Sequence, residues 1–252
     1  MSAICLDRSG TARIWSGESW TTSSEICDRV IKAVIFDFDG LIIDTEEPLY
    51  RAWQRIYRER GHDLPLDRWL TIIGTSPGPF DPVLDLGIRI GAPLDREELR
   101  GLQRRYYLEA TAAQQLLPGV AAYLDAARQL DLKVAIASSS SRTWLTEHLE
   151  RFAIADRFDV IACRDDVTRT KPDPELYLTA LRMLGIASDE AIALEDSRNG
   201  LTAAKAAGIF SVAVPNGLTA AMDLSHADLR LASLNVLSLG ELIKRAQKTA
   251  TP

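Results

Sequence analysis

Short apolar runs alternate with helical patterns along most of this chain. The first run spans residues 33–36, and similar runs follow at 134–137, 158–161, 191–194 and 210–214. Runs of this length fit strands that are buried on both faces. We therefore expect these segments to be the strands of one sheet.

The segments between these runs carry apolar residues at helical spacing. One stripe recurs at intervals of three and four and consists of Val120, Tyr123, Leu124 and Ala127. A second apolar stripe, before Gly185, has the same spacing. A glycine at that position is typical of the end of a helix. Strands that alternate with helices predict an α/β fold, a doubly wound (Rossmann-like) parallel sheet with helices on both faces.

Residues 45–117 break this rhythm. Leu49, Trp53 and Ile56 begin one amphipathic stripe, and a second stripe includes Leu99 and Tyr106. Because no strong strand signal lies between the stripes, we expect a small helical cap inserted after the first strand. The core would then comprise residues 31–44 and 118–252.

Residues 1–30 are rich in Ser, Thr and Gly and show no sustained periodicity. This composition is typical of poorly ordered segments, so we expect a disordered N-terminal extension. Bacterial genes sometimes begin at a valine codon, and Val30 precedes the first predicted strand. We therefore hypothesise that the extension is dispensable or is not translated.

Composition narrows the class of protein. Hydrophobic residues make up 46% of the chain and the net charge is −6, which favours neither nucleic acid nor a membrane surface as a partner. The chain lacks an apolar run of roughly 18 residues, the length of a membrane span. Cys5, Cys27 and Cys163 are scattered and odd in number, so we expect a cytoplasmic protein without disulfides. The polar composition favours a monomer.

Two acids follow the first apolar run. Asp37 and Asp39 lie beside Gly40, and alternation along the chain would turn both carboxylates to the same side. Ligands of open parallel sheets bind where strands end. Two neighbouring carboxylates repel unless a hard divalent cation joins them. The alternative is a loop of solvated acids, which the preceding apolar run disfavours.

A serine run and a lysine offer groups that bind phosphate. Ser138 and Ser139 open a run of four serines after a predicted strand, where hydroxyls and a helix N-terminus can hold an anion. Lys171 stands before a proline, which restricts its backbone. Each segment also has a plain structural interpretation when it is taken alone. The serines would cap a helix, and the lysine would be a surface residue.

A second acidic pair also follows a predicted strand, as the first pair does. Glu195 and Asp196 follow the run 191–194. Together with Asp37 and a backbone carbonyl, they would provide oxygen ligands that suit Mg²⁺. The alternative is a helix cap for the next helical segment.

The order of these four segments resembles one family. The segments read FDFDGLIIDTE, AIASSSS, KPDPELY and LEDSRNG. Across residues 32–245 the chain resembles the haloacid dehalogenase-like superfamily, and in particular its β-phosphoglucomutase and phosphatase-like branch, which carries a helical cap.

This resemblance implies a mechanism and the roles of individual residues. Asp37 would attack phosphorus and form an aspartyl phosphate, while Asp39 would act as acid and then base. Ser138 and the Ser139 N–H would bind the phosphoryl oxygens, and Lys171 would neutralise charge. The metal ligands would be Asp37, the backbone carbonyl of Asp39, Asp196 and Glu195. The chain would thus be a Mg²⁺-dependent phosphatase acting on a small phosphorylated metabolite, with a sugar phosphate as one candidate.

Two departures from the family pattern bear on whether the chain is a hydrolase or a phosphosugar mutase. Leu49 stands where the sugar-phosphate mutases of this branch carry a cap histidine. The loop 74–78 lacks the arginine that these mutases carry in their first cap loop. Both differences favour net hydrolysis over a phosphosugar mutase. A non-catalytic regulatory module is a third hypothesis, which the full set of acids argues against. The same loop matches G-x-S-x-G, but Pro77 lacks the N–H that a serine hydrolase needs there.

Overall fold

The computed structural model describes residues 4–6, 12–15, 20–22, 30–74 and 79–248. Six strands form one parallel sheet with the order β6-β5-β4-β7-β8-β9. These strands are β4 (Ala33–Phe36), β5 (Lys133–Ala137), β6 (Val160–Ala162), β7 (Ala191–Glu195), β8 (Phe210–Ala213) and β9 (Leu229–Arg230). The predicted α/β fold is therefore confirmed.

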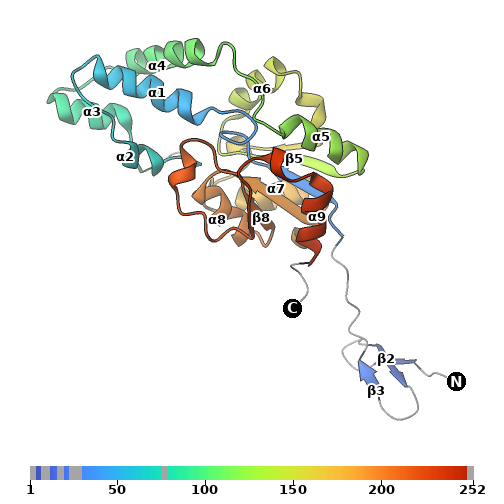
Figure 1. Cartoon of the computed structure of the whole chain (residues 1–252). Helices are drawn as coiled ribbons and strands as arrows, with labels where there is room; N and C mark the ends of the chain where they lie inside the picture. Colours follow the sequence, from blue (N-terminus) through green and yellow to red (C-terminus); the bar gives the residue numbers. More distant parts are fainter. Residues whose placement is uncertain (1–3, 7–11, 16–19, 23–29, 75–78, 249–252) are drawn as a thin grey trace.

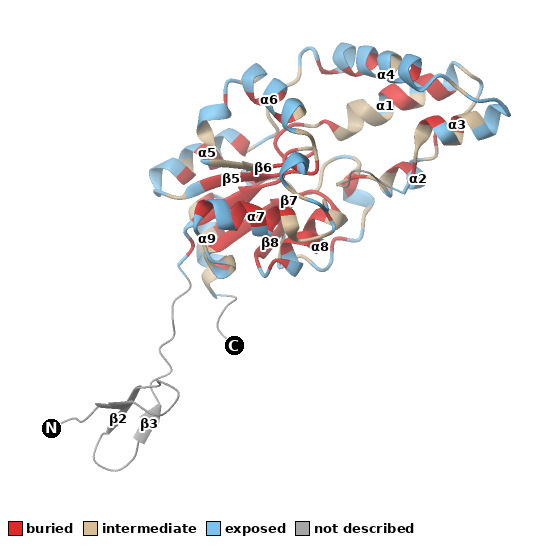
Figure 2. Ribbon diagram, turned by 180° about the vertical axis from the view of Figure 1, so that it is seen from behind, coloured by how far each residue is buried: buried red, intermediate tan, exposed pale blue. Residues whose placement is uncertain are grey.

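Helices cover both faces of this sheet (Figure 1). One face carries larger side chains, such as Phe36 and Leu194, and packs against α5 (Val120–Gln129), α6 (Arg142–Arg151) and α9 (Leu239–Lys248). The other face is lined mainly by alanines of β4, β5 and β7, and it packs against α7 (Glu175–Leu184) and α8 (Arg198–Ala206). Because strand side chains alternate between faces, one short run supplies both surfaces. Figure 2 shows the resulting buried centre and exposed outer helix faces.

The helix α7 ends as its sequence predicts, because Gly185 adopts a left-handed conformation with φ 68° at its C-terminus. Short 3-10 helices complete the core at Ala155–Arg157, Arg164–Asp166, Ser188–Glu190, Thr219–Ala221 and Leu234–Val236. No helix among the described residues is both long and apolar enough to cross a bilayer.

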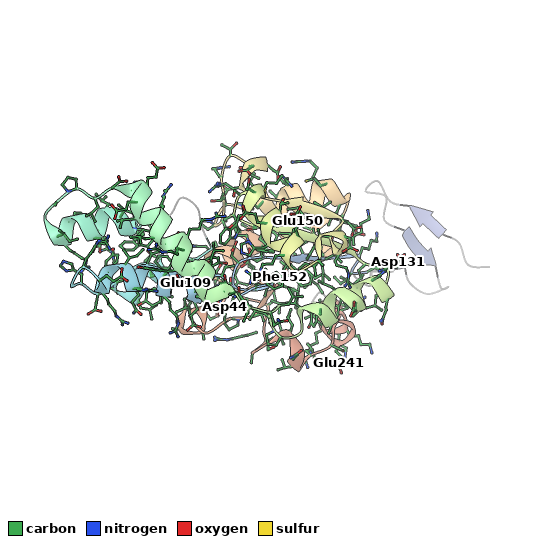
Figure 3. The ribbon with its side chains drawn as sticks, turned by 90° about the horizontal axis from the view of Figure 1, so that it is seen from above. Asp44, Glu109, Asp131, Glu150, Phe152 and Glu241 are labelled. Carbon is green, nitrogen blue, oxygen red and sulfur yellow. The ribbon has the colours of Figure 1, made fainter. Side chains whose placement is uncertain are left out.

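Four helices lie between β4 and α5 and build a core of their own. They are α1 (Glu46–Arg58), α2 (Leu66–Leu70), α3 (Pro82–Ile90) and α4 (Arg96–Thr111). The two predicted stripes face each other, since Ile56 of α1 and Leu99 of α4 belong to one buried cluster. Asp44 lies at the junction of this helical layer and the sheet (Figure 3). The limits 45–117 of the cap remain a prediction.

Three short strands lie within the N-terminal segment for which the sequence predicts disorder. They are β1 (Ile4–Leu6), β2 (Ala12–Trp15) and β3 (Trp20–Thr22), and they pair antiparallel in the order β1-β2-β3. Their alternation was too short to stand out in the sequence. The expectation of disorder for the rest of residues 1–29 falls outside the described residues.

The point where the chain re-enters the core after the cap yields a test of the fold. Gly119 has φ +91°, and a Cβ there would lie 2.5 Å from the carbonyl carbon of Leu234. Gly61 has a similar φ of +74° but nothing within 4 Å of such a Cβ. We expect Gly61→Ala to lower the free energy of unfolding by about 1–2 kcal/mol for the left-handed backbone alone. Gly119→Ala should lose roughly 1–3 kcal/mol more through overpacking.

Urea unfolding of the two variants beside the wild type measures this difference. Equal losses would contradict the packing of Leu234 against the start of α5.

Candidate active site

The register of the sheet brings three strand ends together. Phe36 of β4 pairs with Ile136 of β5 and with Leu194 of β7. The residues that follow these strands therefore lie at the same edge of the sheet. Asp37 continues the ladder, because its N–H donates to the Leu194 carbonyl at 2.9 Å. All the strand-end residues that the sequence singled out thus surround one place.

A buried ammonium joins two of the acids. Lys171 Nζ lies 2.5 Å from Asp37 Oδ1 and 2.6 Å from Glu195 Oε1. The Tyr177 hydroxyl also donates to Glu195 Oε1, at 2.6 Å. Lys171 is only 1% exposed, so its charge can be tolerated only because these carboxylates pair with it. Glu195 thereby fixes Lys171 against Asp37.

Asp196 completes an acidic cluster beside this pair. Carboxylate oxygens of Asp37, Glu195 and Asp196 all lie within 4.8 Å of one another. Asp196 Oδ2 accepts a hydrogen bond from Asn216 Nδ2 at 2.8 Å, whereas its Oδ1 is buried without a partner among the described residues. A buried carboxylate oxygen without a partner is costly. The oxygen-only donors and this unsatisfied atom fit a hard divalent cation such as Mg²⁺.

The pKa values of these groups reflect an excess of negative charge. Burial raises the pKa of Asp37 to about 8 even though Lys171 opposes the shift, and Glu195 and Asp39 add to it. Burial, together with the neighbouring Asp37, also raises the pKa of Asp196 well above its usual value. Burial alone would lower the pKa of Lys171, but Asp37 and Glu195 raise it, so the ammonium keeps its proton. One lysine does not balance three carboxylates.

Asp39 faces the second strand-end loop and lies outside the acidic cluster. Its Oδ2 accepts hydrogen bonds from Ser140 Oγ at 2.6 Å and from Ser138 Oγ at 3.3 Å. Its Oδ1 accepts one from Trp144 Nε1 at 2.9 Å. The carboxylate is thus held by donors on both oxygens at the mouth of the site. Metal ligation was expected from the backbone carbonyl of Asp39, which this side-chain geometry does not test.

Gly40 allows the loop after β4 to come close to Asp196. It has φ +81°, and a Cβ there would lie 2.4 Å from Asp196 Oδ2 and 2.6 Å from Asn216 Nδ2. Asn216 Nδ2 also donates to the Gly40 carbonyl at 3.1 Å. Asn216 therefore ties the loop after β4 to the loop after β7.

Sequence reasoning missed three residues of this site. Asn216 follows the apolar run 210–214, so the same strand-end rule that selected the acids could have found it. Trp144 and Tyr177 reach the site from the first turns of α6 and α7. Only the helix starts next to the serine run and Lys171 hint at them, and helical spacing does not show which way they point.

The cap approaches the same edge of the sheet. A cavity of about 380 Å³ lies there, lined by Asp37, Asp39 and the serine run, and from the cap side by Glu46, Leu49 and Trp69 among others. Ser139 Oγ donates to the Gly74 carbonyl at 3.1 Å, and Asn199 Nδ2 donates to the Ile73 carbonyl at 3.0 Å. The Ser139 hydroxyl is therefore engaged with the cap. Residues 75–78 of the G-x-S-x-G match lie outside the described residues.

One histidine of the chain contributes to packing between the cap and the core. His148 is buried in α6, and its Nε2 lies 3.1 Å from the Tyr107 hydroxyl of α4. Its ring also packs against Trp144, with 4.3 Å between the ring centroids. The residue thus acts in packing between the cap and the core.

Comparisons with known proteins agree with this geometry. The family model described as "Haloacid dehalogenase-like hydrolase" matches residues 34–214. The Bacillus subtilis (strain 168) protein YhcW is 45% identical over 214 residues, covering 85% of this chain and 97% of that protein. Hexitol phosphatase B of Escherichia coli (strain K12) is 33% identical over 226 residues, covering 85% and 98%. The crystal structure of β-phosphoglucomutase from Clostridium difficile superposes with a TM-score of 0.72 at 26% identity, covering 88% of this chain and 100% of that one.

The raised pKa of Asp37 predicts how stability depends on pH in the absence of metal. Between the ordinary value of 3.8 and about 8, the folded protein keeps a proton that the unfolded chain releases. The free energy of unfolding therefore falls as the pH rises through this window. Asp196 acts in the same direction, while carboxyls with lowered pKa, such as Asp166, titrate below the window.

Thermal unfolding in EDTA at several pH values tests this expectation. The midpoint should fall from about pH 5 to about pH 8, and Mg²⁺ should raise it most at the alkaline end, where protons compete least. Asp37→Asn should flatten the pH dependence. A midpoint that rises with pH across this window would contradict the burial of an excess of acids.

Proposed function

Because this chain belongs to the haloacid dehalogenase-like hydrolases, we propose that it hydrolyses the phosphomonoester of a small metabolite with Mg²⁺ as its cofactor. The observation that supports this most directly is the buried contact of Asp37 with Lys171, beside the unsatisfied carboxylate of Asp196. A nucleophile next to a fixed ammonium and a cation site is suited to phosphoryl transfer.

In the first step, an Asp37 oxygen attacks phosphorus. The bond from phosphorus to the leaving oxygen breaks, and this oxygen takes a proton from the Asp39 carboxyl. The product is an aspartyl phosphate together with the free alcohol. Asp39 suits this role because it lies at the mouth of the site, where Trp144 and Ser140 keep its carboxyl group in position.

In the second step, water attacks the phosphorus of the aspartyl phosphate. Asp39, now a carboxylate, takes the proton of this water, and the bond to Asp37 breaks to release inorganic phosphate. Lys171 stays beside the Asp37 oxygen in both steps and offsets its charge. The Ser138 hydroxyl and the Ser139 N–H would bind the phosphoryl oxygens near the start of α6.

Mg²⁺ would be held by Asp37 and Asp196, and by the backbone carbonyl of Asp39. It would neutralise the carboxylates and the phosphoryl oxygens, so that attack by one anion on another becomes feasible. Glu195 contributes through Lys171 and Tyr177, which already occupy its Oε1.

The similarities to known proteins also bear on the class of substrate and on whether the reaction is a hydrolysis or an isomerisation. The similarity to hexitol phosphatase B supports a sugar phosphate as the substrate. The similarity to β-phosphoglucomutase keeps a phosphosugar mutase as the second candidate. Leu49 lines the catalytic cavity at the position of the mutase histidine, and an alkyl side chain cannot exchange a proton with a sugar hydroxyl. Hydrolysis is therefore the better-supported outcome.

Removal of the nucleophile tests the proposal. We expect Asp37→Asn to lower kcat for p-nitrophenyl phosphate with Mg²⁺ by at least about a thousandfold, because an amide does not form the covalent intermediate. Asp131→Asn is the matched control. Asp131 is exposed, and its φ of 53° suits asparagine. Unchanged turnover by Asp37→Asn would end the proposal.

Product analysis separates hydrolysis from isomerisation. With β-glucose 1-phosphate and Mg²⁺, we expect phosphorus NMR to show free phosphate as the product. Conversion to the 6-phosphate would instead identify the chain as a mutase. A purified protein that is inactive across a broad panel of phosphate esters, yet binds a protein partner tightly, would favour a regulatory module.

A further inference from the structure

The carboxylate proposed as acid and base is held by donors of two different kinds. Asp39 Oδ2 accepts hydrogen bonds from Ser140 Oγ at 2.6 Å and from Ser138 Oγ at 3.3 Å. Asp39 Oδ1 accepts one from the Trp144 indole N–H at 2.9 Å. A hydroxyl can donate or accept, whereas an indole N–H only donates. The two oxygens of Asp39 are therefore not equivalent in the proton transfers of hydrolysis.

The indole restricts where the carboxyl group can carry its proton. In a protonated carboxyl group, the oxygen that bears the hydrogen becomes a donor, and the other oxygen remains the better acceptor. Trp144 cannot reverse its role, so its N–H keeps Oδ1 as the acceptor. The Ser140 hydroxyl can turn about its own bond, so it tolerates Oδ2 both with and without a proton. The proton therefore belongs on Oδ2.

The indole of Trp144 is fixed from two sides. Trp144 lies in the first turn of α6, where its backbone N–H donates to Ser141 Oγ at 3.3 Å. The His148 ring of the same helix packs against the indole, with 4.3 Å between the ring centroids. The Tyr107 ring of α4 packs against it from the cap, with 5.3 Å between the centroids. These contacts direct the indole N–H toward Asp39.

Tyr107 and His148 also hold each other in place. His148 Nδ1 lies 2.9 Å from the Trp144 carbonyl, which only accepts, so Nδ1 carries a hydrogen. Nε2 of the neutral ring then accepts the Tyr107 hydroxyl, at 3.1 Å. Tyr107 is 2% exposed and His148 5% exposed, so little water competes for this hydrogen bond. The rings that support the indole thus have one arrangement.

We propose that Trp144 is a positioning residue that reserves Oδ1 of Asp39, so that Oδ2 is the oxygen that exchanges protons with the substrate and with water. This inference rests on the proposed function, in which Asp39 is the acid and the base. In the first step, the Oδ2–H bond breaks and the proton passes to the leaving oxygen. In the second step, Oδ2 takes a proton from the attacking water. Oδ1 keeps the indole hydrogen bond throughout.

Two esters with different leaving groups separate proton transfer from the rest of catalysis. p-Nitrophenolate leaves without a proton, whereas the alkoxide of an alkyl phosphate needs the proton of Asp39. We would measure kcat/KM with Mg²⁺ for p-nitrophenyl phosphate and for an alkyl phosphate that the wild type accepts, such as glucitol 6-phosphate. Trp144→Phe keeps an aromatic ring but lacks the N–H. We expect it to lower kcat/KM for the alkyl ester about tenfold more than for the aryl ester.

Two further variants separate the hydrogen bond from packing and from substrate contact. The amide nitrogen of Trp144→Gln lies the same number of bonds from Cβ as the indole nitrogen, and it donates, but no ring remains beside His148. Trp144→Gln should therefore recover part of the alkyl-to-aryl ratio that Trp144→Phe loses, whereas a packing role predicts the reverse order. Trp69→Phe is the matched control. Trp69 also lines the catalytic cavity, but its indole N–H has no partner among the described residues, so both esters should change by the same factor.

The indole hydrogen can also be followed without turnover. In protein labelled with ¹⁵N, the indole signal of Trp144 is the one that Trp144→Phe removes. A carboxylate accepts a stronger hydrogen bond than a neutral amide, so Asp39→Asn should move this signal. Asp131→Asn removes an exposed carboxylate elsewhere and should leave it in place. A Trp144 signal that does not respond to Asp39→Asn would overturn the inference.

The outcomes for the hydrolase and for Trp144 are distinct. Equal losses for both esters in Trp144→Phe, or the same shift of the ratio in Trp69→Phe, would leave the hydrolase standing and overturn the role of Trp144. Hydrolysis of no ester by the wild type, with the indole signal still moved by Asp39→Asn, would overturn the hydrolase and leave the hold of Trp144 on Oδ1 standing. Melting curves identify any variant that fails to fold.

Discussion

Three carboxylates crowd into a dry space around one ammonium, and the rest of the site depends on this crowding. Asp37, Glu195 and Asp196 are each no more than 4% exposed, and Lys171 satisfies only two of them. Charges buried in this way are tolerated only when fixed donors or a cation meet them. The Tyr177 hydroxyl and the Asn216 amide supply such donors from outside the cluster. A divalent cation would supply what remains.

The sheet brings the carboxylates together, and the cap helices lie over the same edge of the sheet. Parallel register sets the ends of β4, β5 and β7 level, so residues distant in sequence meet without any long loop. Gly40 then allows the first loop to touch the third, because a Cβ would collide with Asp196 there. The helices inserted after β4 bring apolar and cationic walls over the same edge. In the proposed function, the edge of the sheet therefore carries the chemistry and the cap contributes to the choice of substrate.

Sequence patterns predicted the α/β fold and named most residues that meet at the site, for a definite physical reason. Asp37, Ser138 and Glu195 directly follow or end apolar strands, so the sheet alone dictates where they lie. Trp144 and Tyr177 escaped notice because their direction depends on how α6 and α7 pack, which spacing does not reveal. Glu195 lies in the acidic cluster with Asp37 and Asp196, and its Oε1 also meets Lys171 and Tyr177, so its place among the metal ligands stays a prediction. The strands β1 to β3 were too short for their alternation to be recognised.

The contact between the cap loop and the core has a consequence for divergence. Ser139 and Asn199 of the core donate to the main-chain carbonyls of Gly74 and Ile73. Carbonyls are present whatever the side chain, so these two anchors place few demands on the cap sequence. The exception is Gly74, since a Cβ there would lie 2.3 Å from Ser197 Oγ. Cap side chains can therefore be exchanged while these two main-chain anchors between the cap loop and the core are kept.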